Sequence, residues 1–195
     1  MTRTSRYKLG YFGYMLAALA AFIWAQIHFH LTILALPVVV LALLLPGRIV
    51  GFFWRDLLRG LRLFNAKEYA ASKRCSERFL VQIRDRPWMK HLIWLAGGAY
   101  SRDPEVLALN NLGAAEFLLG EWQWARKHLD RAIELDDQCP LPYYNIAALL
   151  DAAGDHAQAA QWFGEAKRRG LTGGKSDKFF MAAQARFAES DGRGA

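Results

Sequence analysis

One pattern of residues occurs twice along this chain, at a constant spacing of 34 positions between residues 109–136 and 143–170. Asn111 pairs with Asn145, and Gly120 pairs with Gly154. A fixed period of this length is typical of a repeat unit that cannot bury its apolar face alone and stacks on its neighbour. We therefore expect an array of repeats, a fold that usually binds other proteins and rarely performs chemistry.

The repeated positions resemble the tetratricopeptide repeat, a helix–turn–helix unit. In the first copy the matching residues are Leu109, Asn111, Leu112, Gly113, Phe117, Gly120, Trp122, Ala125, Leu129 and Ala132. In the second copy they are Tyr143, Asn145, Ile146, Ala147, Leu150, Gly154, Ala159, Phe163 and Ala166. Glu116, Asp137 and His156 depart from the family pattern. The resemblance implies two tetratricopeptide units over residues 104–170.

The resemblance also implies a binding surface, because in this family the first helix of each pair lines a concave face that holds a peptide. Transferred by position, the surface consists of Leu107, Asn110, Asn111, Ala114, Leu118, Leu141, Tyr144, Asn145, Ala148 and Asp151. No Lys or Arg stands at these positions, so an apolar or amphipathic segment of a partner protein is expected rather than an acidic chain end. The open alternative is that residues 88–96 of the chain itself fill this surface.

The flanks of the two units carry weaker signals. Residues 66–85 look like the second helix of a degenerate repeat, within a region of residues 48–103 that precedes the two units. Residues 171–195 are expected to hold a capping helix and a tail. Residues 177–188 carry an amphipathic pattern with Phe179, Phe180 and Phe187, which favours packing as a cap.

The N-terminal region lacks charge, because no Asp, Glu, Lys or Arg occurs between Leu9 and Gly47. One apolar helix needs roughly 20 residues to cross a bilayer. Residues 1–47 are therefore predicted to form a transmembrane hairpin with spans at about 10–27 and 31–46. Lys and Arg flank both outer ends, so we expect an integral, multi-pass protein of a bacterial inner membrane with both termini in the cytoplasm.

Residues 49–64 have an amphipathic helical pattern with two interpretations. The first is an interfacial helix whose cations contact anionic lipid headgroups, and the second is a core helix with a solvated face. Residues 1–100 hold 14 Lys and Arg against 4 Asp and Glu, so positive charge is concentrated here. The expected headgroup contacts are Arg48, Arg55, Arg59 and Arg62.

The sequence contains no recognisable catalytic motif, and no cofactor or metal is expected. Nucleic acid is not an expected partner, because the basic residues do not form a stripe on the repeats. The predicted fold is all-α, with a transmembrane hairpin followed by an α-solenoid of helix pairs and a C-terminal capping helix. The predicted function is a membrane-anchored scaffold for protein–protein interaction at a cytoplasmic face. The alternative is an accessory or assembly subunit of a membrane enzyme complex, binding through the hairpin.

Overall fold

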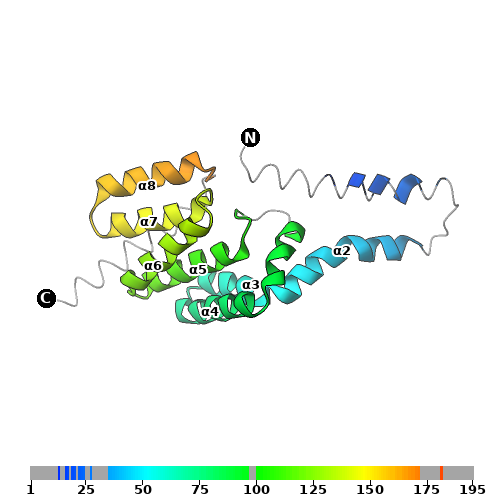
Figure 1. Cartoon of the computed structure of the whole chain (residues 1–195), viewed down its shortest axis with the longest axis horizontal. Coiled ribbons are helices and arrows are strands. Elements are labelled where there is room, and N and C mark those ends of the chain that lie inside the picture. The colour runs from blue at the N-terminus through cyan, green and yellow to red at the C-terminus, as the bar shows by residue number, and fades with distance from the viewer. Residues whose placement is uncertain are drawn as a thin grey trace.

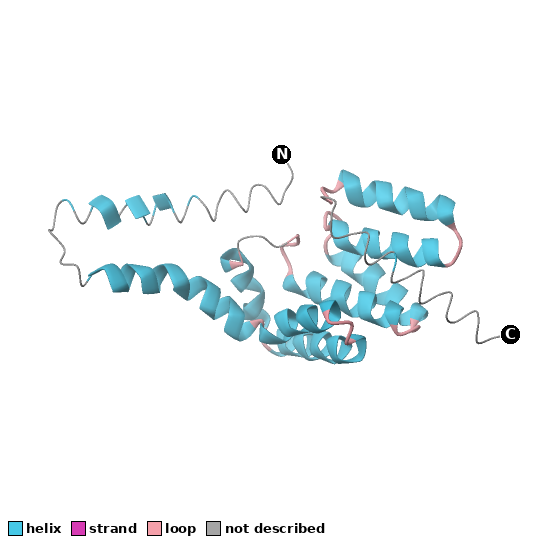
Figure 2. Cartoon of the chain, turned by 180° about the vertical axis from the view of Figure 1, so that it is seen from behind, coloured by secondary structure: helices cyan, strands magenta, loops and turns pink. Residues whose placement is uncertain are grey.

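The computed structural model describes residues 35–96 and 100–171, together with residues 13, 16, 17, 19, 20, 22–24, 27 and 181. Throughout these described residues the regular structure is helical and no strand occurs (Figure 2), which confirms the predicted all-α class. The elements are α2 (Ala35–Phe53), α3 (Arg55–Asn65), α4 (Tyr69–Asp85), the 3₁₀-helix η1 (Pro87–Leu95), α5 (Pro104–Leu118), α6 (Trp122–Leu135), α7 (Pro140–Ala152) and α8 (His156–Arg168).

Helices α5 to α8 form two helix pairs that stack side by side (Figure 1). Helix α5 packs on α6 and α7 packs on α8, while α6 contacts α7 and α5 contacts α7. The helix starts are well defined locally, because the Asp103 carboxylate accepts a hydrogen bond from the Glu105 N–H and Pro104 occupies the first turn. This arrangement agrees with the predicted α-solenoid.

Close contact between the two helices of a pair requires a small residue at one position. A methyl group added at Gly113 would lie 2.8 Å from Leu129 Cγ and 3.0 Å from the Ala125 carbonyl oxygen. The turn that follows requires a left-handed residue, and Gly120 has a φ of 84°. Gly154 has the same role in the next pair, with a φ of 86°.

Helices α3 and α4 repeat this geometry 53 positions earlier in the chain. Lys67 stands where the next pair has Gly120, and it too is left-handed, with a φ of 65°. The Lys67 N–H donates to the Phe64 carbonyl at 2.9 Å, just as the Gly120 N–H donates to the Phe117 carbonyl at 3.0 Å. The two turns are therefore built in the same way.

The contact between α3 and α4 is equivalent as well. Gly60 occupies the position of Gly113, and a methyl group on it would lie 3.3 Å from Cys75 Cβ. Ser72 and Phe79 on α4 are fully buried. Because α4 also packs along α5, the described part of the chain holds three stacked helix pairs: α3–α4, α5–α6 and α7–α8.

An extra segment, η1, separates the first pair from the second. Met89 of η1 is buried among Trp54, Phe79 and Ile83, and the Trp54 indole N–H lies 3.4 Å from the Met89 carbonyl oxygen. Lys90 Nζ lies 2.8 Å from an Asp103 carboxylate oxygen at the start of α5. This segment therefore ties the first pair, the end of α2 and the second pair together.

The predicted membrane hairpin is not supported. No helix among the described residues has both the length and the apolar character needed to cross a bilayer. Helix α2 does not end at Gly47, the predicted exit, but continues past Pro46 and Arg48 to Phe53. Its charge-free part, residues 35–47, rises only about 20 Å, whereas a hydrocarbon core is about 30 Å thick. The predicted localisation, a multi-pass integral membrane protein with both termini in the cytoplasm, was therefore wrong.

Other predictions fall on residues that the structure does not describe. These are most of the first predicted span, residues 10–27, the start of the second, residues 31–34, and the predicted capping helix over residues 177–188 apart from Met181.

The amphipathic pattern of residues 49–64 belongs to the end of α2 and to α3. Val50, Trp54 and Leu57 are buried in one cluster with Phe79 of α4. This face of the pattern is therefore part of the protein core. Helix α3 also carries two exposed apolar side chains, Leu58 and Leu61.

Candidate peptide-binding surface

The first helices of the three pairs, α3, α5 and α7, form one side of the array, which we call the first-helix surface. Helix α5 is central, because it contacts α3 on one flank and α7 on the other. The ten residues predicted for the peptide surface lie on α5 and α7. The structure thus brings the two halves of the predicted set onto neighbouring helices.

Burial divides the predicted set. The half-buried members are Leu107, Asn111, Leu141 and Asp151. The buried members are Asn110, Ala114, Leu118, Tyr144, Asn145 and Ala148. A side chain must be accessible from solvent to contact a partner. The half-buried residues are therefore better candidates for peptide contacts than the buried ones.

Two of the half-buried residues are also packed against neighbouring elements. Leu107 lies against the cluster that includes Met89 of η1, and Leu141 lies against the cluster of Val106, Leu109 and Cys139. Segment η1 therefore reaches the N-terminal edge of α5. Its described contact with the predicted peptide surface is at Leu107.

Asn145 has a structural partner. Its side-chain amide donates a hydrogen bond of 2.8 Å to the Asn110 side-chain oxygen, and both residues are buried. This bond joins α7 to α5 and satisfies two polar groups that burial would otherwise penalise. Asn111, the residue that pairs with Asn145 in the repeat, is half-buried instead.

Helix α3 contributes two surface residues that the sequence pattern did not identify. Leu58 and Leu61 stand 53 positions before Asn111 and Ala114, so they occupy the equivalent places on the first-helix surface. They are 39% and 46% exposed. A search at a spacing of 34 misses them, because the segment that contains η1 lengthens the interval between the first and second pairs.

A polar network lies between the first two pairs. The Glu116 carboxylate, 2% exposed, lies 2.7 Å from His128 Nδ1 and 3.9 Å from Lys73 Nζ. The hydrogen bond between Lys73 and Glu121 raises the pKa of Lys73, which keeps this ammonium charged. Within the described residues, no group of three His, Cys, Asp or Glu side chains is placed to hold a metal ion.

Both cysteines are buried and free. Burial raises the pKa of the Cys139 thiol to about 12. The thiolate is the reactive form of cysteine, so Cys139 is chemically inert near neutral pH. The Arg78 guanidinium donates to Cys75 Sγ at 3.2 Å, but Cys75 is only 2% exposed, so neither thiol is accessible from solvent.

The four arginines predicted to contact lipid, Arg48, Arg55, Arg59 and Arg62, are exposed on the end of α2 and on α3. Three of them flank the exposed leucines of α3. Their contact with anionic headgroups stays a prediction.

Stacked helix pairs with one surface made by the first helices define the class of this protein, an α-helical repeat protein. Residues 106–139, which cover α6 and most of α5, match the tetratricopeptide repeat family. This match supports the resemblance found in the sequence and indicates a role in protein–protein interaction. Searches of curated proteins and of solved structures gave no match.

Proposed function

We propose that the protein is a scaffold that binds an amphipathic segment of a partner protein on its first-helix surface. The tetratricopeptide match supports protein binding as the activity. The observation that carries the proposal is the exposure of Leu58 and Leu61, two apolar side chains at surface positions of the first pair. Fully burying a leucine side chain contributes about 1.5–3 kcal/mol, so two of them form a useful anchor.

Charge narrows the chemistry of the partner. Exposed Arg55, Arg59 and Arg62 lie along one side of the two leucines on α3. An apolar stripe flanked by Asp or Glu would complement this surface, because each leucine would be buried while the arginines meet opposite charge. The proposed ligand is therefore an amphipathic helix with an acidic edge.

The alternative function, an accessory subunit that binds through a transmembrane hairpin, depended on the membrane assignment and is not retained. Scaffolding through the repeat array does not depend on that assignment. The proposal therefore concerns the described helix pairs alone.

The function can be tested with a displayed library of amphipathic helical peptides selected against the full chain. The combined substitution Leu58→Asp and Leu61→Asp is expected to weaken binding of the selected peptides at least tenfold, because each aspartate removes an apolar contact. The matched control is Val81→Asp, since Val81 is 45% exposed on α4, a second helix. Equal affinity of both variants would contradict the proposed surface.

A further inference from the structure

Segment η1 exposes a row of aromatic side chains. In a 3₁₀-helix, side chains three positions apart lie above one another. Trp88, His91 and Trp94 form one such row, and all three are exposed. The row that begins with Met89 packs into the core instead. Segment η1 therefore presents two tryptophans to solvent, of which Trp88 is 47% exposed and Trp94 67% exposed.

This row continues onto the end of α2. The Phe53 ring meets the Trp88 ring edge-on, with centroids 4.9 Å apart, and the Phe52 ring meets the Phe53 ring edge-on at 5.2 Å. Phe52 is 67% exposed. The exposed rings therefore come from two elements that contact each other. We call Phe52, Trp88 and Trp94 the aromatic ridge.

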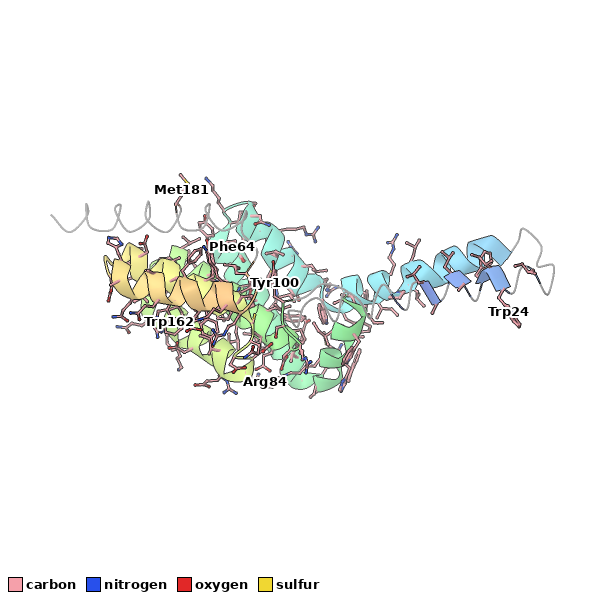
Figure 3. All side chains as sticks on the ribbon, turned by 90° about the horizontal axis from the view of Figure 1, so that it is seen from above. Trp24, Phe64, Arg84, Tyr100, Trp162 and Met181 are labelled. Atoms are coloured by element: carbon pink, nitrogen blue, oxygen red, sulfur yellow. The ribbon has the colours of Figure 1, made fainter. Side chains whose placement is uncertain are left out.

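Helix α2 extends the aromatic ridge along its own axis. Leu44, Arg48 and Phe52 are four positions apart, so they share one helical face, and all three are exposed. Figures 1 and 3 show that α2 leads away from the helix pairs. The ridge and this face of α2 are therefore distinct from the first-helix surface, which α3, α5 and α7 form.

The charge beside the aromatic ridge is positive. Neither α2 nor η1 contains an Asp or Glu residue. Arg48 lies on α2, and Arg86 directly precedes η1; both are exposed. Over residues 44–96 the chain holds 11 Lys and Arg against 4 Asp and Glu. Charge complementarity therefore favours an anionic partner for this surface.

The combination of exposed rings and cations favours a lipid surface as that partner. Tryptophan suits the interface of a bilayer because its ring is apolar and its N–H is polar, and cations beside an apolar face meet the headgroups. Among the described residues, every large exposed apolar side chain except Trp124 and Met181 precedes residue 95. Apolar exposure and positive charge thus gather at the same end of the chain. A bilayer surface is extended, so it can contact α2 and η1 together.

We propose that the aromatic ridge, together with Arg48 and Arg86, docks on the surface of a bilayer that contains anionic phospholipid. The three rings enter the boundary between headgroups and acyl chains, while the guanidinium groups stay at the lipid phosphates. This docking requires no helix to cross the bilayer. It also does not rest on the proposed peptide binding, which uses other side chains.

The direct test places an environment-sensitive nitrobenzoxadiazole label between the two tryptophans, through His91→Cys in the full chain. Cys75 and Cys139 are buried and stay unlabelled. With vesicles of phosphatidylcholine and phosphatidylglycerol, emission of the label is expected to shift to the blue and to be quenched by brominated acyl chains. The matched control is the same label through Lys127→Cys, beside the exposed Trp124, and its emission is expected to stay unchanged.

Three outcomes would overturn the proposal. The first is an unchanged label at residue 91, and the second is an equal change at residues 91 and 127. The third is a blue shift at residue 91 that appears without vesicles and grows with protein concentration, which would assign the ridge to contact between copies. Total binding to vesicles is not the readout, because the charge-free residues 9–47 are themselves apolar.

A second measurement tests the aromatic ridge itself. Adding Phe52→Ser and Trp94→Ser to the chain labelled at residue 91 is expected to reduce the blue shift at least twofold, because the rings that enter the bilayer are lost. Both side chains are 67% exposed, so the fold is preserved. Trp124→Ser is the matched control, since Trp124 is 53% exposed on α6, and it should leave the shift unchanged. An undiminished shift in the double variant would overturn the proposed ridge.

A third measurement tests the charge. Arg48→Gln together with Arg86→Gln is expected to reduce the blue shift on the mixed vesicles, and vesicles of phosphatidylcholine alone are expected to give little shift. An equal shift on both kinds of vesicle would contradict docking on anionic lipid. These results do not depend on the displayed peptide library, so failure of the library to yield a ligand would count against the scaffold function alone.

Discussion

At the scale of single residues, the array depends on a few positions where size decides whether two helices can approach. Gly113 is the strictest of these, because Leu129 and the Ala125 carbonyl leave no room for a methyl group. Gly164 on α8 has nothing within 4 Å of the place where a methyl group would be added. The two glycines are both helical, yet only one is required by packing.

We predict that Gly113→Ala destabilises the protein by about 1–3 kcal/mol, because Leu129 and the helix backbone must shift to admit the methyl group. Gly164→Ala should instead stabilise it by up to about 1 kcal/mol, since alanine is the better helix former. Urea unfolding of both variants measures the difference. If both variants lost a similar amount of unfolding free energy, the close approach of the two helices at Gly113 would not explain the destabilisation.

At the scale of elements, the three pairs share one turn geometry with different residues in it. The turn between α3 and α4 uses Lys67 in the left-handed conformation that Gly120 and Gly154 adopt in the other pairs. A residue with a side chain pays about 1–2 kcal/mol for this conformation, whereas glycine adopts it freely. The turn of the first pair therefore carries backbone strain at Lys67, whereas the turns of the other two pairs, with glycine at this position, do not.

Replacing Lys67 with Gly should raise the free energy of unfolding by about 1 kcal/mol, because the strain disappears. Gly120→Ala should lower it by a similar amount, since nothing else lies within 4 Å of the added methyl group. Thermal denaturation of the two variants gives the comparison. Destabilisation by Lys67→Gly would show that the lysine side chain contributes more than its backbone costs.

The repeat is recognisable from the sequence in α5 to α8 but not in the α3–α4 pair, because small and large residues occupy different positions in that pair. In the second pair Leu129 is large and Ala132 is small, whereas the equivalent residues of the first pair are Ser76 and Phe79. This exchange of size hides the repeat from a comparison of residue types. The sequence still indicated a helix at residues 66–85, because its apolar spacing remains helical, and α4 lies there.

The binding surface was predictable only in part. The repeat predicted which helices form the surface. It also predicted equivalent surface positions for Asn111 and Asn145. Their burial differs because Asn145 bonds to Asn110 across two helices, a contact that depends on tertiary packing. The charge-free N-terminal run was misread for a related reason, since composition alone does not fix where a helix ends.

At the scale of the whole molecule, the three pairs should unfold as one unit. Helix α4 packs on both α3 and α5, and the carboxylate of Glu116 bridges toward Lys73 of the first pair and His128 of the second. Such a buried group links neighbouring repeats, whose stability is a sum of internal and interface contributions.

Accordingly, Glu116→Gln should lower stability by about 1–3 kcal/mol, because a buried charged hydrogen bond becomes a neutral one. The control is Glu134→Gln, whose pair with Arg131 is exposed and which should change stability by less than about 0.5 kcal/mol. A single urea transition is expected for every variant, followed by far-ultraviolet circular dichroism and by tryptophan fluorescence. Separate transitions for the two probes would show that the pairs unfold independently.

The junction between α2 and α3 has a mechanical consequence. Trp54 alone separates the two helices, and its φ of −101° and ψ of 19° depart from helical values. Backbone hydrogen bonds still run from the Trp54 N–H to the Val50 carbonyl and from the Leu58 N–H to the Trp54 carbonyl. Its indole is held against η1. The direction in which α2 leaves the repeat array is therefore set at this one residue, whose side chain is packed against Phe79 of α4 and Met89 of η1.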